Sequence, residues 1–335
     1  MRLASPAMDS AHRHLGHWKD WGLPGCASLL ALLLAVSLGS ATDGPFEVWR
    51  GLLVEEDPLA RALIIELRLP RALAAYCTGA ALALAGLLMQ VLLRNPLADP
   101  YVLGVSGGAA VAALACLLMG VSGLWLDAAA AGGAILVTWL VFSLAGTRAS
   151  SERLLLTGVV VASACGAAIG MMLAVADAQP ARGMLFWLMG EVGDPELPWL
   201  LGGLLLLVAP LLVASGRGLD VLARGTLQAA ALGLGVRAAR NSAFLIASLL
   251  TAAAVTQSGT IGFIGLVTPH LMRQWVGNSH RRLVPASLLA GGTLLTLADL
   301  LARTLFAPRQ LPVGAVTALL GVPAFLYLLI RRTPR

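Results

Sequence analysis

The chain has 335 residues, of which 58% are hydrophobic and only 12% are charged, far below the roughly 25% of charged residues in typical soluble domains. Its formal charge of +6 comes from arginines and a single lysine, Lys19, and these are scattered between apolar segments. This composition excludes an ordinary soluble domain, argues against nucleic-acid binding and favours a protein that lies in lipid.

Ten apolar segments come close to the roughly 20 residues that a helix needs to cross the hydrocarbon core of a bilayer. They predict an all-α integral membrane fold, with a ten-span domain over residues 25–332, a cytoplasmic tail at 1–24 and a short tail at 333–335. The ten segments lie at residues 25–41, 71–92, 101–120, 126–146, 154–176, 198–215, 241–257, 260–276, 284–301 and 313–330.

The distribution of charge predicts the orientation of these segments. Ten spans place both ends of the chain on one side of the membrane. If that side is the inner one, the inner segments hold 16 of the 23 basic residues and 5 of the 17 acidic residues. Cytoplasmic loops carry an excess of basic residues, so we expect cytoplasmic N- and C-termini.

The stretch "RNPLADPYVLGVSGGA", residues 94–109, lies between the second and third segments and is unusually polar for this chain. Pro96 and Pro100 disfavour helical geometry at the residues that precede them. Gly104 and its neighbours allow a turn and a close approach of helices. The stretch predicts a long polar turn on the inner face.

Two catalytic interpretations of the glycines can be weighed. A P-loop needs a lysine after its second glycine, and the only lysine is Lys19 in the N-terminal tail, so we expect no ATP hydrolysis through a P-loop. The run from Gly104 to Gly108 fits G-x-S-x-G and resembles the motif of rhomboid proteases. An intramembrane serine protease that uses Ser106 and His270 therefore stays an alternative.

The four cysteines lie in apolar runs and form no C-x-x-C pair, so we expect no metal site in this chain.

Long blocks of the sequence resemble the permease family of type II ABC importers, which carry cobalamin, ferric siderophores and haem. The first block is "RLPRALAAYCTGAALALAGLLMQVLLRNPLADPYVLGVSGGA", residues 68–109. The later blocks "GTIGFIGLVTPHLMR", "LADLLAR" and "LPVGAVTALLGVPAFLYLL" resemble the last three spans of the family. The resemblance covers about residues 60–332, and ten spans are also the number typical of the family.

The resemblance implies a non-catalytic homodimer with a translocation path on its two-fold axis. Two ATPase subunits would dock inside and a periplasmic substrate-binding protein outside. ATP and Mg²⁺ would bind to the ATPases, so we expect no cofactor on this chain and no nucleic-acid partner. The matched positions of the cytoplasmic gate are Asn95, Leu97, Ser150 and Ser151. A simple turn role for Asn95 stays open, since Asn is favoured in turns.

The segment 216–240 resembles the coupling helices that contact the ATPases, and it carries four arginines against one acid, Asp220. A basic inner loop without a coupling role is the alternative. Where the family often has an acidic pair, this chain has Thr226 and Leu227. The positions assigned to coupling by the resemblance are Arg217, Arg224, Gly225, Leu232, Gly233 and Arg237.

Three arginines of the predicted outer face, Arg68, Arg71 and Arg303, match positions that pair with glutamates of the binding protein in the family. The planar guanidinium group binds carboxylates through two parallel hydrogen bonds. Snorkelling of the arginines at the ends of spans is the alternative.

The predicted fifth span carries a small residue at every fourth position: Gly158, Ala162, Gly166 and Gly170. Helical spacing places these four on one stripe. In the family this span lines the path near the dimer axis, so the stripe is expected to face cargo or the partner subunit, with packing inside the chain as the alternative. Arg182, in "QPARGMLFWLMGEV", is expected to meet anionic cargo, unless this segment is an interfacial anchor.

The resemblance thus implies a permease subunit in the bacterial inner membrane, driven by separate ATPases through alternating access. The expected cargo is an iron chelate, haem ahead of ferric siderophore, with cobalamin as the next alternative.

Overall fold

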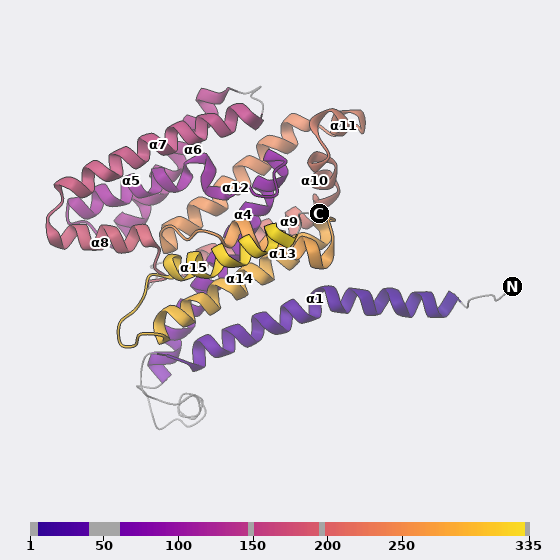
Figure 1. The fold of residues 1–335 in the computed structure, drawn as a ribbon, viewed down its shortest axis with the longest axis horizontal. Helices are drawn as coiled ribbons and strands as arrows, with labels where there is room; N and C mark the ends of the chain where they lie inside the picture. Colours follow the sequence, from indigo (N-terminus) through magenta and orange to yellow (C-terminus); the bar gives the residue numbers. More distant parts are fainter. Residues whose placement is uncertain (1–5, 40–60, 147–150, 194–197, 332–335) are drawn as a thin grey trace.

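The computed structural model describes residues 6–39, 61–146, 151–193 and 198–331, and every regular element in these ranges is helical (Figure 1). The elements are α1 (Pro6–Ser37), η1 (Leu63–Arg68, a π-helix), α4 (Leu69–Leu93), η2 (Pro100–Leu103, a 3₁₀-helix), α5 (Val105–Leu118), α6 (Leu124–Ala145), α7 (Ser151–Val175), α8 (Ala178–Met189), α9 (Pro198–Ala214), α10 (Gly216–Ala223), α11 (Thr226–Ala231), α12 (Val236–Ser258), α13 (Ile264–Val276), α14 (His280–Thr304) and α15 (Val313–Arg331).

Helix α4 forms the core of the molecule. Its sequence is apolar on all sides, which is typical of a helix that is surrounded by other helices. It packs against α14, α12, α13 and α9 (Figure 1). The helices cross at glycines: a Cβ on Gly79 would lie 2.2 Å from the carbonyl oxygen of Gly291, and one on Gly86 would lie 1.9 Å from that of Gly265. Because glycine has no side chain, these helices can pack at a distance that any other residue would prevent.

Helices α5, α6 and α7 form a second group that lies beside α12, and α7 also contacts α4 (Figure 1). A Cβ on Gly108 of α5 would lie 2.5 Å from the carbonyl oxygen of Gly133 in α6. A Cβ on Gly107 would lie 2.9 Å from Cβ of Cys165 in α7. Small residues thus bring the three backbones together without interlocking large side chains.

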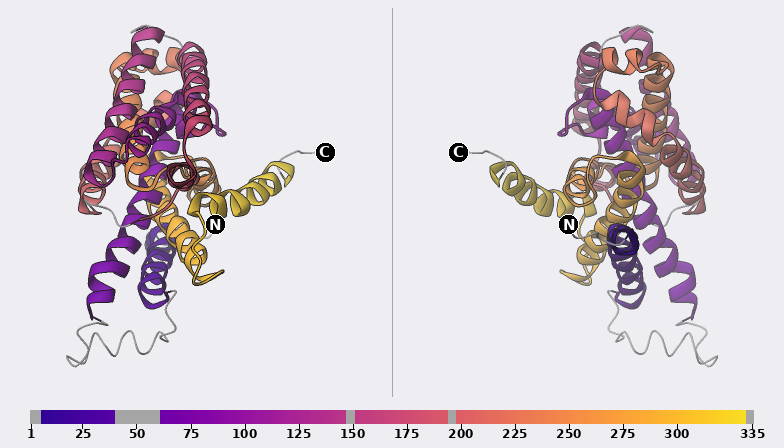
Figure 2. Two further views of the ribbon diagram at one scale, coloured as in Figure 1. Left: turned by 90° about the vertical axis from the view of Figure 1, so that its left-hand side faces the viewer. Right: turned by 90° about the vertical axis from the view of Figure 1, so that its right-hand side faces the viewer.

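Helices α1 and α15 lie at the edge of the bundle. In α1, the hydroxyl of Ser28 lies 2.9 Å from that of Thr293 and 3.2 Å from the carbonyl oxygen of Leu289, so α1 packs along α14. Helix α15 leans away from the other helices (Figure 2), and its Leu319 is 76% exposed. The free apolar face of α15 is consistent with contact to lipid or to another protein.

A helix lies within each of the ten predicted segments, but in the described part of the chain five helices are long and apolar enough by themselves to cross a membrane. These are the combined helix Leu63–Leu93, Leu124–Ala145, Glu152–Val175, Val236–Ser258 and His280–Thr304. A sixth is obtained if α9 and α10, which meet at a bend of 65°, are counted together. The all-α architecture is confirmed, whereas ten spans and cytoplasmic termini stay predictions.

Several predicted boundaries differ from the structure, among them the start of α12 at Val236 rather than at 241. Two of the differences have a visible local cause. Helix α5 begins at Val105 rather than at 101, because Pro100 opens a 3₁₀ turn that ends at Gly104 with φ of 75°. Helix α13 begins at Ile264 rather than at 260, after Phe263 with φ of 70°. Helix α1 begins at Pro6, well inside the predicted tail at 1–24, while the predicted tail at 333–335 lies outside the described residues.

Candidate functional site

The polar stretch after α4 is a sharply turned loop. Arg94 ends α4 in the left-handed region, with φ of 49°. The side-chain oxygen of Asn95 accepts a hydrogen bond of 2.9 Å from the backbone N–H of Leu97, and Asp99 accepts one of 2.8 Å from Tyr101. Burial raises the pKa of the Asp99 carboxyl, and the hydrogen bond from Tyr101 acts in the opposite direction. The side-chain hydrogen bonds of Asn95 and Asp99 thus stabilise the turns of this loop.

Tyr101 ties this loop to the turn between α12 and α13. Its hydroxyl donates a hydrogen bond to the carbonyl oxygen of Ile261 and accepts one from the N–H of the same residue, both at 3.0 Å. Pro100 also contacts α13, since a Cβ on Gly265 would lie 2.7 Å from its ring. The loop is therefore anchored at its end near Tyr101, while Asn95 and Leu97 are exposed.

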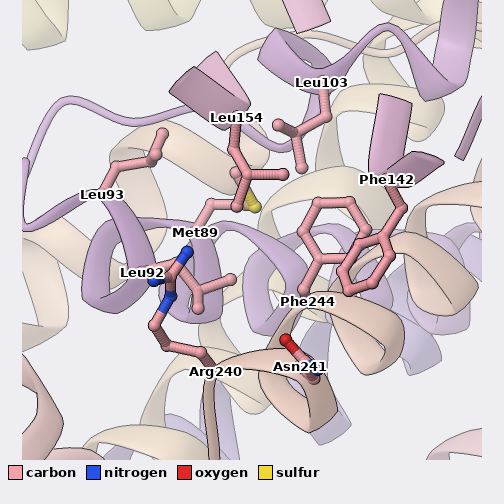
Figure 3. Close-up of a pocket in the computed structure, with 9 residues that line it drawn as sticks. All are labelled: Met89, Leu92, Leu93, Leu103, Phe142, Leu154, Arg240, Asn241 and Phe244. Atoms are coloured by element: carbon pink, nitrogen blue, oxygen red, sulfur yellow. The ribbon is translucent and has the colours of Figure 1, made fainter. Parts of the chain in front are cut away.

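Chain segments next to both halves of the predicted gate border one small, mainly apolar cavity (Figure 3), but none of the four predicted gate residues is among the described residues that line it. Leu93, directly before the loop, and Leu154, in the first turn of α7, lie on its wall. Ser151 is the first residue of α7 and Ser150 lies outside the described residues, so the structure describes neither hydroxyl. The lining residues are Met89, Leu92, Leu93, Leu103, Phe142, Leu154, Arg240, Asn241 and Phe244.

The predicted coupling segment is built from two short helices, α10 and α11, and the first turn of α12. Gly225 separates the two short helices with φ of 123°. The assigned residues Arg217, Arg224, Leu232, Gly233 and Arg237 are exposed, whereas Gly225 is buried. Leu227, which stands where the family often has an acid, is 87% exposed, so α11 presents an apolar side chain.

Two contacts connect the coupling segment with the rest of the molecule. The Arg94 guanidinium would lie 3.7 Å from a Cβ on Gly225, so the loop after α4 reaches the junction of α10 and α11. Asp220 of α10 lies 2.6 Å from Nδ1 of His280, the first residue of α14. The sequence gives no sign of a contact between Asp220 and His280, because the two residues are 60 positions apart.

The three arginines that the sequence predicts on the outer face lie together at one end of α14. Arg303 lies 3.0 Å from Asp299, and its Nη2 donates to the carbonyl oxygen of Ala35 at 3.2 Å. Arg71 donates to Asp299 and, through Nη1, to Gln310 at 3.1 Å. Arg68 lies at 3.4 Å from the carbonyl oxygens of residues 36 and 37. Arg68 and Arg303 are buried, and Arg71 keeps 17% of its side chain exposed.

This arrangement makes Arg71 the most accessible of the three guanidinium groups. The contacts of Asp299 with these arginines were not predicted. The i,i+4 spacing of Asp299 and Arg303 on one helix is a readable signal for their pair, but the contact of Asp299 with Arg71 requires the packing of α14 on α4.

The structure divides the stripe of small residues on α7. Its first half packs inside the chain: a Cβ on Gly158 would lie 2.9 Å from Leu103, and Ala162 faces Gly104. Its second half is open, since a Cβ on Gly166 or Gly170 would meet nothing within 4 Å among the described residues. The first half of the stripe is therefore buried against the chain itself, and the second half is open.

Arg182 is exposed near the start of α8, with its guanidinium carbon 5.9 Å from the ring centre of Phe186. The end of α8 is held firmly, because Thr260 donates to the carbonyl oxygen of Leu188, and the N–H of Glu191 donates to that of Ser258 at 3.0 Å. Arg182 thus lies on a helix whose end is anchored, and its side chain is exposed.

Ser106 and His270 belong to different parts of the fold. Ser106 lies in α5, which packs chiefly against α6 and α7. His270 is buried in α13, which packs against α4 and α14, and its ring lies edge-on to Phe325 at 6.2 Å. Among the described residues, no group of three or more His, Cys, Asp or Glu could hold a metal ion.

Comparisons with known proteins agree over nearly the whole chain. The sequence model of the FecCD transport family matches residues 27–331. The hemin transport system permease protein HmuU of Yersinia pestis is 40% identical over 91% of this chain and 94% of its own length. The vitamin B12 import system permease protein BtuC of Escherichia coli O157:H7 is 37% identical over 90% of this chain and 92% of its own length.

A solved structure shares the fold. It is described as a metal-chelate type ABC transporter in an inward-facing conformation, and it superposes with a TM-score of 0.82 at 28% identity. The superposition covers 92% of this chain and 97% of the other chain. The architecture of α1 to α15 is therefore that of a known membrane transporter subunit.

Proposed function

The chain belongs to the FecCD transport family and is a multi-pass permease subunit of an ABC importer, and we propose that it carries an iron chelate, haem or a ferric siderophore, from periplasm to cytoplasm. ATP hydrolysis in this family takes place on separate ATPase subunits, so the chain is not an enzyme. The comparisons give no support to the protease alternative with Ser106 and His270.

The family match over residues 27–331 carries this conclusion, and the relatives guide the choice of cargo. A relative at 40% identity is named for hemin transport, and one at 37% for vitamin B12 import. A fold relative is described as a metal-chelate type transporter. Haem is therefore the first candidate and ferric siderophore the next. Cobalamin is the alternative, supported by the relative named for vitamin B12 import.

We propose that two copies of the chain enclose the path, in a bacterial inner membrane with both termini in the cytoplasm. The open half of the α7 stripe and the leaning α15 supply free apolar surface for a second copy. In this arrangement Gly166 and Gly170 would border the path or the partner, and Gly158 and Ala162 would hold α7 onto the gate loop. Arg182 would meet the carboxylates of cargo such as haem propionates.

Two ATPase subunits would bind the exposed surface of α10 and α11, and a periplasmic binding protein would bind the opposite end. The Leu227 and Leu232 side chains suit a cleft with apolar walls, and the arginines around them suit acidic groups at its rim. At the outer end, Arg71 is the accessible partner for a carboxylate of the binding protein, with Arg68 and Arg303 behind it. The inner gate would be formed by Asn95, Leu97, Ser150 and Ser151.

The test is reconstitution of the permease with its ATPase and binding protein in liposomes. We expect uptake of haem that depends on ATP and on the binding protein, with weaker uptake of ferric siderophore or cobalamin. Uptake of cobalamin alone would reassign the cargo while keeping the transporter. Absence of ATP-dependent uptake of all three would overturn the proposed function.

A further inference from the structure

Asp220 joins a coupling helix to the longest helix that follows it. Its Oδ1 accepts a hydrogen bond of 2.8 Å from the backbone N–H of His280 and lies 2.6 Å from Nδ1 of the same residue. Asp220 is on α10 and His280 is the first residue of α14. One carboxylate oxygen thus contacts both the backbone and the side chain at the start of α14.

The contact supplies a helix cap from outside the helix. The first N–H groups of a helix lack partners within it, and a side chain at the N-cap position commonly supplies one. Ser279 occupies the N-cap position of α14 with extended backbone, but its side chain makes no capping hydrogen bond. Asp220 provides this acceptor instead, and its negative charge also suits the positive end of the helix dipole.

The surroundings of His280 support a specific contact. The His280 side chain is buried, and its Nε2 has no hydrogen-bond partner among the described residues. A neutral ring with its proton on Nδ1 donates to Asp220 and leaves no second N–H buried without a partner. Gly216 adds a backbone contact, since a Cβ there would lie 2.9 Å from the nitrogen of Arg281.

Helix α14 continues from this contact to the opposite end of the molecule. Its 25 residues extend about 37 Å at the usual rise of 1.5 Å per residue. Gly291 in its middle crosses α4 at Gly79 with no room for a side chain. Its last turns carry Asp299 and Arg303, which form the outer cluster with Arg71. One helix therefore connects the coupling segment with the predicted docking surface.

We propose that Asp220 is a positioning residue that makes α10 and α14 move as one unit, so that ATPase movement at α10 reaches the outer cluster through α14. The inference rests on the proposed function, because it assigns a route for coupling within that transport cycle. The route needs no contact between cargo and either residue. Its carrier is the hydrogen-bonded cap at the start of α14 together with the close crossing of α14 and α4.

The first experiment compares Asp220→Ala with Asp220→Asn. The asparagine keeps an oxygen that accepts both hydrogen bonds, whereas the alanine removes it. Loss of a cap raises the opening equilibrium constant of a helix end about fivefold. We therefore expect the amide exchange rate of the peptide around residues 280–283 to rise about fivefold in Asp220→Ala. In the reconstituted transporter, cargo taken up per ATP hydrolysed should fall by a similar factor. Asp220→Asn should stay within about twofold of the wild type in both measurements.

Two outcomes would overturn the inference. Unchanged amide exchange in Asp220→Ala would show that the cap does not exist. Faster exchange with wild-type uptake per ATP would show that the contact only stabilises the fold. If the wild type itself takes up no haem, ferric siderophore or cobalamin, the proposed function fails, while the exchange result still reports on the contact.

A second experiment decides the matter if Asp220→Ala does not fold, because replacing both partners leaves no buried imidazole without its acceptor. Asp220 and His280 are both replaced by cysteine in a chain whose four native cysteines are alanine, and the pair is bridged with a short bifunctional methanethiosulfonate. If α10 and α14 move as one unit, the bridged protein transports at least as well as the unbridged one. Loss of transport on bridging, reversed by a reductant, would mean that the helices must separate, and would overturn the inference.

Discussion

Arg71 of α4 and Asp299 of α14 are joined by two hydrogen bonds: Nε and Nη2 of Arg71 both donate to Oδ1 of Asp299, at 3.2 and 3.1 Å. Oδ2 of the same carboxylate lies 3.0 Å from Nε of Arg303. Asp299 is 1% exposed, so a single buried carboxylate compensates two guanidinium groups. This relationship connects the stability of the outer end with its predicted role in docking.

Removing the carboxylate should destabilise the protein strongly. We expect Asp299→Ala to lower the free energy of unfolding by about 3–5 kcal/mol, because it leaves buried charges without their partner. The measurement is denaturant unfolding in detergent micelles. Glu66→Ala removes an exposed carboxylate at the same end and should change stability little. Equal effects of the two variants would contradict the structural role of Asp299.

Arg71 is the most accessible arginine of this cluster, and because it also holds Asp299, its variant is tested for both folding and docking. We expect Arg71→Gln to weaken binding of the periplasmic protein about tenfold or more, because it removes an accessible charged donor from the interface. Binding to immobilised permease measures the affinity, and its decrease with added salt should be smaller in the variant. Arg309→Gln, at an exposed arginine of the same end, is the matched control. Wild-type affinity of Arg71→Gln would contradict the docking assignment.

Hydropathy and charge predicted where the helices lie, because each segment must present about 20 apolar residues to lipid. The chain around Arg94 and Gly104 was also recognisable as a turn from its prolines and glycines. What the sequence could not show is which residues share a contact across the bundle. Asp220 and His280 lie 60 positions apart, and their meeting depends on how α10 folds back on α14.

The same limit applies to the predicted sites. Three arginines were expected on the outer face, but their burial depends on the end of α1 and on Asp299, which only the packed structure brings together. Likewise, helical spacing predicted one stripe on α7, whereas tertiary packing covers Gly158 and leaves Gly166 open. Periodicity shows which residues share a face, and the neighbouring helices decide what that face contacts.

Gly166, in the open half of the α7 stripe, and Gly86, in the core helix α4, should respond differently to substitution. Gly166→Leu should fold normally, since open space surrounds the site in the described part, but it should reduce ATP-dependent uptake at least tenfold by filling the path or the subunit interface. Gly86→Ala should instead destabilise the fold by about 3 kcal/mol, because its Cβ would lie 1.9 Å from the carbonyl oxygen of Gly265. Unfolding curves and uptake are measured on both. Full uptake by folded Gly166→Leu would remove the path assignment.

The exposed leucine of α11 should contribute to binding of the ATPase. Burying a leucine side chain contributes about 1.5–3 kcal/mol, so Leu227→Asp should weaken ATPase binding by about 10- to 100-fold. Co-purification at graded ATPase concentrations measures this affinity. Gln228→Asp places the same charge one residue away on the same helix and should have a much smaller effect. If the two variants weaken binding equally, charge rather than apolar contact explains the result.

The loop after α4 should control passive leakage at the inner face. Leu97 is 42% exposed, so Leu97→Ala should leave the fold intact but allow cargo to escape from loaded liposomes without ATP, several times faster than in the wild type. Asn95→Ala should also leak, because it removes the acceptor that holds Leu97 in place at 2.9 Å. Asn95→Asp keeps that acceptor and should stay tight. Met119→Ala, at an exposed residue beyond the far end of α5, controls for loss of any exposed apolar side chain. If liposomes with Leu97→Ala do not leak cargo, the loop is a structural turn and not a gate. A gate that loses its blocking side chain must leak whether or not the ATPases are present.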